Sequence, residues 1–213
     1  MTRIAVIDFE TTGISTSMGD RATEVAIVIT EHGRVVDRYQ SLMNAGVRLS
    51  AFITQFTGIT NAMVEAAPPA ETVMREAARF VGGVPMVAHN ASFDRRFWMA
   101  ELARAGMDAP HLFACTVLLS RRLYPEAPSH KLGSLVDFFR LPRTGQAHRA
   151  LADAEMAAEL LGRIQHDLRA RHGVGAPDHT FLMGLQRCTR AALPTFIQAH
   201  NQRQNQALST RAA

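Results

Sequence analysis

Cysteine is scarce in this 213-residue chain, which contains only Cys115 and Cys188. The two lie far apart and lack the close spacing that metal-binding cysteines share. We therefore expect both to be buried free thiols, and we expect the protein to work in a reducing cytoplasm.

Long apolar runs are absent as well. No segment approaches the ~18 uninterrupted apolar residues of a membrane-spanning helix. A strand is expected almost at the first residue, so no signal peptide is predicted. The composition, with 47% hydrophobic and 20% charged residues, is that of a globular protein. The sequence therefore predicts one domain, with or without an appendage, and no membrane partner.

Acidic residues are rare near the C-terminus. From residue 160 onward the chain has seven arginines against Asp167 and Asp178, so this stretch carries +5 of a total net charge of +4, and residues 1–159 sum to −1. A basic flank suits a polyanionic partner. The alternative is a solvated helix face followed by a mobile tail.

Apolar and β-branched runs predict five strands. The first three follow one another with tight turns, as in an antiparallel meander, and the last two alternate with helices. The predicted strands are Arg3–Asp8, Glu24–Thr30, Arg34–Leu42, Pro85–His89 and Leu112–Cys115. This order indicates an α/β fold in which helices flank a mixed sheet.

Helical periodicity and capping residues predict the remaining elements. After short helical pieces within 51–66, the predicted helices are Ala70–Val81, Ser92–Ala105 with Ser92 as N-cap, Thr116–Tyr124, Lys131–Phe139 and Ala150–Arg171. The pattern degrades from Val174. We therefore expect residues 1–173 to form the domain and residues 174–213 to form a basic, partly helical extension with a frayed end.

Asp8 and Glu10 are two residues apart at the end of the first predicted strand. Residues i and i+2 of a strand point to the same face, so the two carboxylates should project together and repel. A hard divalent cation removes that repulsion, and oxygen ligands favour Mg²⁺ or Mn²⁺ over Zn²⁺. Taken alone, such a pair also fits a solvated strand edge.

Taken alone, Asp94 and His148 also have explanations that need no metal site. Asp94 could simply complement the dipole of a helix start, and His148 could be a surface or packed histidine. The five-residue separation of His148 from Asp153 places them on different helix faces. We therefore expect His148 in the loop before the helix and Asp153 in its first turns, where the histidine could accept a proton near neutral pH.

Three segments together resemble a known family. Asp8-Phe-Glu-Thr-Thr-Gly13, His89-Asn-Ala-Ser-Phe-Asp94 and His148-Arg-Ala-Leu-Ala-Asp153 are similar, in order and spacing, to the three motifs of the DEDDh 3′–5′ exonucleases. This family includes the proofreading subunit of bacterial replicative DNA polymerases. The resemblance covers about residues 3–165 and implies a ribonuclease H-like fold.

The resemblance also implies a two-metal phosphodiesterase. It assigns metal ligation to Asp8, Glu10, Asp94 and Asp153, with Asp8 bridging both ions, and it makes His148 the general base. Two cations can clamp the attacking and leaving oxygens of an in-line displacement. An acidic pocket would otherwise repel a phosphodiester, so such a site makes sense only when it holds metal.

The same resemblance suggests where the substrate binds. Around the terminal nucleotide it implies contacts from Thr11 and Thr12, from Gly58 and Ile59 flanking the base, from His89, Asn90 and Phe93, and from Lys131 to a phosphate. Phe93 could stack a base or be a core aromatic, and Lys131 could be an ordinary surface lysine.

The substrate and the partners remain open at this level. The first motif favours a single-stranded DNA 3′ end, from which nucleoside 5′-monophosphates would be released. An exoribonuclease and a non-catalytic docking module are the alternatives. Residues 174–213 could bind a DNA polymerase, or a sliding clamp through Gln206-Ala-Leu-Ser209, which resembles a clamp motif only faintly.

Overall fold

A computed structural model describes residues 3–143, 145 and 148–212 of the chain, with side chains through residue 207. In this part of the chain, five strands form one mixed sheet in the order β3-β2-β1-β4-β5. The strands are β1 (Arg3–Thr11), β2 (Ala22–Glu31), β3 (Arg34–Leu42), β4 (Met86–Ala88) and β5 (Phe113–Cys115). β1, β2 and β3 pair antiparallel, whereas β1, β4 and β5 run parallel. The predicted mixed five-stranded α/β sheet is confirmed.

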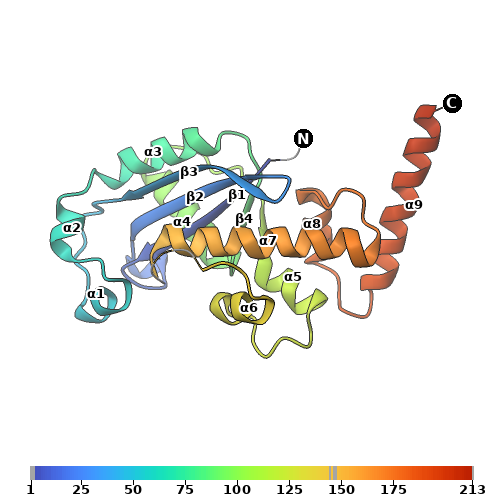
Figure 1. The fold of residues 1–213 in the computed structure, drawn as a ribbon. Coiled ribbons are helices and arrows are strands. Elements are labelled where there is room, and N and C mark those ends of the chain that lie inside the picture. Colours follow the sequence, from blue (N-terminus) through green and yellow to red (C-terminus); the bar gives the residue numbers. More distant parts are fainter. Residues whose placement is uncertain (1–2, 144, 146–147, 213) are drawn as a thin grey trace.

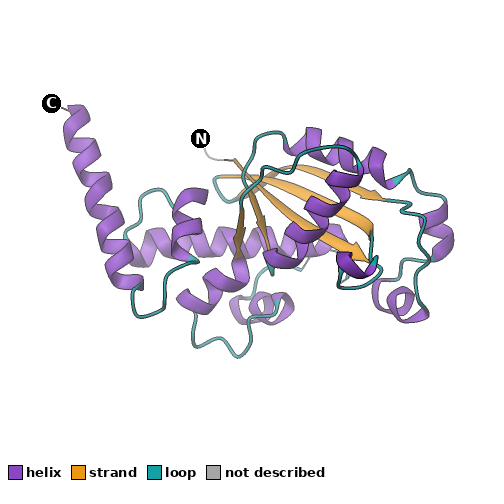
Figure 2. Ribbon diagram, turned by 180° about the vertical axis from the view of Figure 1, so that it is seen from behind, coloured by secondary structure: helices purple, strands orange, loops and turns teal. Residues whose placement is uncertain are grey.

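Helices cover both faces of the sheet (Figures 1 and 2). They are η1 (Thr16–Met18), α1 (Ala51–Thr57), α2 (Asn61–Glu65), α3 (Ala70–Val81), α4 (Ala91–Arg104), α5 (Thr116–Leu123), α6 (Leu132–Phe139), α7 (Ala150–His172), α8 (His179–Leu185) and α9 (Leu193–Ala212). Among the described helices, none has the length and hydropathy that crossing a bilayer demands.

Strand alternation divides the core into two layers. Ile4 and Val6 of β1 pack with α7 in one buried cluster, whereas Ala5 and Ile7 pack with α3 and α4 in the other. By the same alternation, Asp8 lies on the α7 side of the sheet. The β1 end that carries Asp8 and the first turn of α7 therefore meet at one edge, which lies at the left of Figure 1.

Three predicted boundaries at this edge were wrong. β2 begins at Ala22, two residues before the predicted start at Glu24. β1 continues three residues beyond Asp8, because Phe9 and Glu10 still pair with β2. The N-cap of α4 is Asn90 rather than Ser92, and Asn90 has a left-handed backbone with φ 71°. Asparagine is one of the few residues that adopt this conformation readily, so the helix begins two residues early and Ser92 lies inside its first turn.

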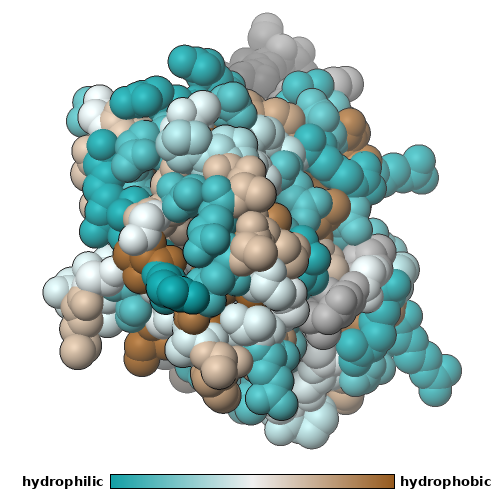
Figure 3. All heavy atoms as spheres, turned by 90° about the vertical axis from the view of Figure 1, so that its left-hand side faces the viewer, coloured by the Kyte–Doolittle hydropathy of each residue, from teal (hydrophilic) through white to brown (hydrophobic). Residues whose placement is uncertain are grey.

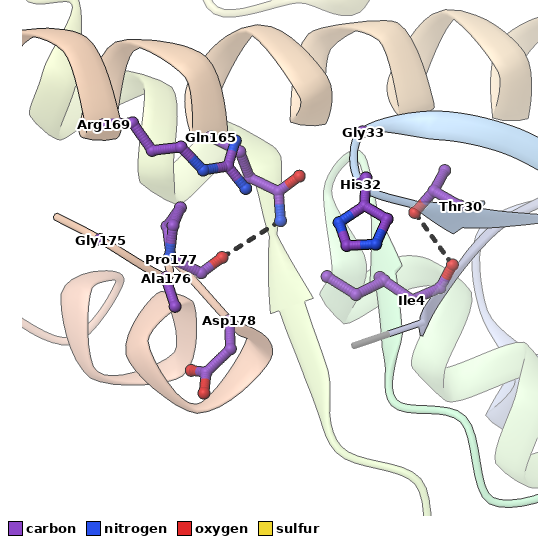
Figure 4. Close-up of a pocket in the computed structure, with 10 residues that line it drawn as sticks. All are labelled: Ile4, Thr30, His32, Gly33, Gln165, Arg169, Gly175, Ala176, Pro177 and Asp178. Atoms are coloured by element: carbon purple, nitrogen blue, oxygen red, sulfur yellow. Dashed lines mark hydrogen bonds between the residues drawn. The ribbon is translucent and has the colours of Figure 1, made fainter. Parts of the chain in front are cut away.

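The C-terminal segment packs onto the body before it projects away. Phe181 and Leu182 of α8 are buried in the same cluster as α7. Figure 4 shows Pro177 beside Gln165, whose Nε2 donates to the Pro177 carbonyl oxygen at 3.1 Å. These two residues help to line a cavity of about 290 Å³ at the edge of the sheet opposite Asp8. The proposed boundary at residue 173 stays a prediction.

The last helix differs from the sequence-based expectation. The sequence predicts a frayed end, whereas α9 is continuous from Leu193 to Ala212 and extends away from the body (Figures 1 and 2). Pro194 is the second residue of this helix, a position where the missing N–H costs little. Asn201 Nδ2 donates to the His172 carbonyl oxygen at 3.1 Å, so the middle of α9 contacts the end of α7.

Candidate metal and phosphodiester site

Three carboxylates from two elements meet at this edge of the sheet. Asp8 and Glu10 come from β1, and Asp153 comes from the first turn of α7. One oxygen of each lies within 4.8 Å of one oxygen of the other two. Three oxygen donors at such separations can share a metal ion.

Asp94 joins this group from the opposite helix layer. It lies in the first turn of α4, is only 2% exposed, and raises the pKa of Asp8 through its charge. Its Oδ1 is buried and has no hydrogen-bond partner among the described residues. Buried carboxylate oxygens normally have a partner, so this oxygen is free to ligate a cation. We refer to Asp8, Glu10, Asp94 and Asp153 as the carboxylate cluster.

Burial raises the pKa of every member of the cluster, and repulsion by neighbouring carboxylates raises the pKa of Asp8 and Glu10 further. Burial is the main cause, and it raises the pKa of Glu10 from 4.5 to about 8 and that of Asp94 from 3.8 to about 8. The pKa of Asp8 is raised well above its ordinary value, by burial and then by the charges of Asp94, Asp153 and Glu10. Such groups gain most from a cation that stabilises their ionised form.

His148 lies where the sequence predicted, in a turn just before α7. Its side chain is exposed and its backbone has φ 61°. Burial raises the pKa of Asp153, and the charge of His148 and the His148 backbone N–H, which donates to the carboxylate, oppose that shift. The histidine therefore lies at the solvent side of the carboxylate cluster.

Glu24 is a site residue that the sequence did not reveal. It pairs with Glu10 across β1 and β2 and is fully buried. Its carboxylate accepts hydrogen bonds from Arg149, from the backbone N–H of Ala150 and from Gln40. Burial alone would raise the pKa of Glu24, but these hydrogen bonds outweigh burial and lower it. Glu24 thus fixes the start of α7 beside the cluster, and the only signal in the sequence was its place as the first residue of the predicted strand Glu24–Thr30.

Two aromatic residues of α1 were also missed. The Phe56 ring lies 3.9 Å from the His148 ring, centroid to centroid, and it stacks on Phe52 at 6.0 Å. Phe52 is 70% exposed and Phe56 is 48% exposed. The surface at this edge is otherwise mostly hydrophilic, with separate hydrophobic patches (Figure 3). Phe56 lies two residues before Gly58, which the resemblance placed beside the terminal base, but the sequence does not reveal that the Phe56 ring faces outward.

The residues predicted to contact the terminal nucleobase differ in their accessibility. Gly58 ends α1 in a left-handed conformation, whereas the Ile59 side chain is 0% exposed and packs with Leu49 and Val64. The Ile59 side chain therefore cannot reach a base without a rearrangement. Phe93 is half-buried with its ring 4.9 Å from Phe97, which supports its reading as a core aromatic.

The other predicted substrate residues lie on two sides of the cluster. Thr11 Oγ1 donates to the Gly13 carbonyl oxygen at 2.6 Å, and Thr12 Oγ1 donates to Asp20 at 3.3 Å. These bonds shape the turn after β1.

On the other side, His89 is hydrogen-bonded to Thr116 at 2.8 Å and to the His130 carbonyl oxygen at 3.1 Å. Burial lowers the pKa of His89 to about 4, so its ring is neutral. Asn90 and Lys131 are exposed beside it.

Comparison with known proteins identifies the family of this chain. A family model described as an exonuclease (RNase_T) matches residues 5–161. The chain belongs to this exonuclease family. The resemblance predicted from the three motifs is therefore confirmed.

Individual relatives of this chain agree with the family assignment. The chain is 39% identical over 168 residues to the 3′-5′ exonuclease DinG of Bacillus subtilis, a match that covers 78% of this chain and 18% of DinG. It is 34% identical over 164 residues to the PolC-type DNA polymerase III of Caldanaerobacter subterraneus, covering 77% of this chain and 12% of the polymerase. The chain thus spans under a fifth of the length of these relatives.

Solved structures show the same fold. Exonuclease X in complex with 5′ overhanging duplex DNA is 30% identical, with a TM-score of 0.64 over 76% of this chain and 91% of that chain. E. coli exonuclease I in complex with a dT13 oligonucleotide is 16% identical, with a TM-score of 0.70 over 86% of this chain and 46% of that chain. The ribonuclease H-like fold predicted for this chain is confirmed.

The carboxylate cluster fits the divalent metals that this exonuclease family uses. Its donors are all carboxylate oxygens, the ligands of hard cations. A bound cation would take the unpartnered Oδ1 of Asp94 as a ligand. It would also stabilise the ionised form of Glu10, whose pKa is raised.

Proposed function

We propose that the chain is a metal-dependent 3′–5′ exonuclease that releases nucleoside 5′-monophosphates from single-stranded DNA ends. The observation that carries this proposal is the meeting of Asp8, Glu10 and Asp153 within 4.8 Å, with the free oxygen of buried Asp94 beside them. Four carboxyl groups with raised pKa values at one edge of the sheet are costly to ionise, and bound cations remove that cost.

The four carboxylates would hold two divalent cations, Mg²⁺ or Mn²⁺. Such ions, when bound, stabilise charge on the attacking and leaving oxygens of a phosphodiester in an in-line displacement. Water attacks the phosphorus of the terminal nucleotide, and the bond from phosphorus to the 3′ oxygen of the preceding nucleotide breaks. The products are a nucleoside 5′-monophosphate and a strand with a new 3′-hydroxyl.

His148 would accept the proton of the attacking water. It is solvent-exposed, and its backbone N–H is bonded to Asp153. The ion pair of Arg149 with Glu24 anchors the next residue of the chain. A general base needs this combination of access to water and a fixed position.

DNA is the favoured substrate. The PolC-type relative is named as a DNA polymerase, exonuclease X was solved with duplex DNA that has a 5′ overhang, and E. coli exonuclease I was solved with a dT13 oligonucleotide. An exoribonuclease is the second candidate, because the acidic residues act on the phosphodiester rather than on the sugar. A polymerase or clamp partner for residues 174–213 and a cytoplasmic location stay predictions.

Matched DNA and RNA oligonucleotides of one sequence test the substrate. We expect faster cleavage of single-stranded DNA with Mg²⁺ or Mn²⁺ and none in EDTA. H148A should lower kcat by about 10²–10⁴-fold while the affinity for metal is retained. Faster cleavage of RNA would replace the DNA assignment, and an unchanged H148A rate would remove His148 from the base role.

A further inference from the structure

A groove leads away from the carboxylate cluster across the carboxyl ends of β4 and β5. It consists of two adjoining cavities of about 520 Å³ and about 290 Å³, which share Asn90, Val117 and Arg121 in their linings. The first cavity also contains His89 and Lys131, and the second contains Arg95 from α4, which is why we call the pair the basic groove.

The basic groove begins beside the site because β1, β4 and β5 are parallel. Val6 of β1 pairs with Val87, so His89 follows β4 at the level of Asp8 on the neighbouring strand. Ala88 pairs with Cys115, which places Thr116 at the level of His89. Neighbouring strands lie about 4.8 Å apart. The floor of the groove therefore begins at His89, one strand spacing from Asp8, and continues to Thr116, two spacings or about 10 Å from Asp8.

The charge of the groove is opposite to that of the cluster. Its linings include Lys131, Arg121 and Arg95, all exposed, and no Asp or Glu of the described part of the chain lines it. Within the described residues, none of these three side chains is held in an ion pair. His130 also lines the groove, and its pKa is lowered by burial and by the charge of Arg121, against the opposing charge of Glu126.

The floor of the groove is rigid and neutral. His89 donates through Nε2 to the His130 carbonyl oxygen, so its Nδ1 accepts from the Thr116 hydroxyl. Because both ring nitrogens of His89 are hydrogen-bonded within the protein, the exposed cations Arg121, Lys131 and Arg95 are the lining groups that can meet a ligand. Arginine and lysine are the side chains that proteins place on phosphates.

We infer that the basic groove binds the phosphodiester backbone of the strand upstream of the scissile phosphate, with Arg121 at its centre and Lys131 and Arg95 on either side. The inference rests on the proposed function, because it takes the carboxylate cluster to hold the scissile phosphate. The two regions divide the work. Metal would neutralise the phosphate that reacts, and basic side chains would neutralise those that do not.

The groove gives the enzyme a means to select for strand length. A substrate with only one phosphate would meet the cluster and leave Arg121 without a ligand. Each occupied basic side chain should add to affinity and to its salt dependence, by a slope of about 0.7 per phosphate on a single strand. The groove should contribute little to base preference, since phosphate contacts carry no sequence information.

Charge reversal at Arg121 tests the inference. The probe is a fluorescent oligothymidylate whose anisotropy is followed in Ca²⁺, at several salt concentrations, with R121E, the double variant R95E/R121E and wild type. R79E is the matched control, because Arg79 is an exposed arginine in the last turn of α3, the end of that helix that leads into β4. We expect R121E to raise Kd about tenfold and to reduce the salt slope by about 0.7, as for the loss of one phosphate contact. R79E should bind like wild type.

Hydrolysis of p-nitrophenyl thymidine 5′-phosphate, which lacks an upstream strand, separates this inference from the proposed function. The ratio of kcat/KM for the oligonucleotide to that for the small ester should fall about tenfold in R121E and stay constant in R79E. If R121E and R79E bind and cleave alike, the groove is not the strand path. If wild type cleaves neither substrate, the proposed function fails, while the binding measurement still decides the groove.

Discussion

Glu24 and Arg149 form a two-point ion pair between the sheet and the start of α7. Arg149 Nη2 lies 2.7 Å from Glu24 Oε1, and Nε lies 3.1 Å from Oε2. The Glu24 side chain is 1% exposed, whereas that of Arg149 is 29% exposed. Since Arg149 follows His148, the pair fixes the segment that carries the proposed base relative to the carboxylate cluster.

This asymmetry of exposure predicts unequal costs for removing the two partners. R149M leaves a buried carboxylate without its cation, which should lower the free energy of unfolding by about 3–5 kcal/mol. E24Q leaves an arginine that can turn toward water, so its cost should be about 1–3 kcal/mol. Urea unfolding of both variants checks this order, and a larger loss in E24Q would contradict it.

The contact of Phe56 with His148 predicts a positioning role for the phenyl ring. A pair of aromatic rings in contact contributes about 0.5–1.5 kcal/mol, so F56A should lower kcat about two- to tenfold, and F56W should restore much of it. F52A is the matched control, because Phe52 is more exposed and stacks on Phe56. In the H148A background F56A should have no further effect on kcat, and equal losses in both backgrounds would show that Phe56 acts independently of His148.

The raised pKa values of the buried carboxyl groups predict how the stability of the fold depends on pH. Glu10 and Asp94 change from ordinary pKa values of 4.5 and 3.8 to about 8 in the folded chain. A raised carboxyl pKa stabilises the fold below the unfolded pKa, and that stabilisation is lost as the pH rises through the folded pKa. In EDTA, Tm should therefore fall between about pH 5 and about pH 8, and Mn²⁺ should restore it most at the upper end.

D94N provides the comparison for this effect, since an amide does not titrate. Its Tm in EDTA should fall less steeply over the same range than that of wild type. Differential scanning fluorimetry measures both slopes, and parallel curves would mean that Asp94 does not carry the effect.

Much of the fold could be predicted because local pattern and tertiary structure agree. The β-branched run of β2 and the apolar face of α3 specify their own elements. The start of α4 depends instead on the left-handed backbone of Asn90, which competes with Ser92 as a cap. The end of β1 depends on pairing with β2, which a single segment does not reveal.

The site also contains residues that local spacing predicts and residues that only tertiary packing reveals. The i and i+2 spacing of Asp8 and Glu10 is a local property, so a shared face could be predicted. The buried role of Glu24 and the exposure of Phe56 depend on how β2, α1 and α7 come together, so the sequence alone did not indicate them. Ile59 shows the converse, because a residue near the site by sequence is enclosed in a small core with Leu49 and Val64.

Cleavage of a 5′-labelled single strand by wild type and D8N tests the central claim most directly. D8N removes one member of the carboxylate cluster together with its repulsion, so the variant should fold and be at least as stable as wild type in EDTA. With Mg²⁺, wild type should shorten the labelled strand one nucleotide at a time from the 3′ end, and D8N should leave it intact. Cleavage by D8N at the wild-type rate, or release of the 5′ label by wild type as the first product, would contradict the account.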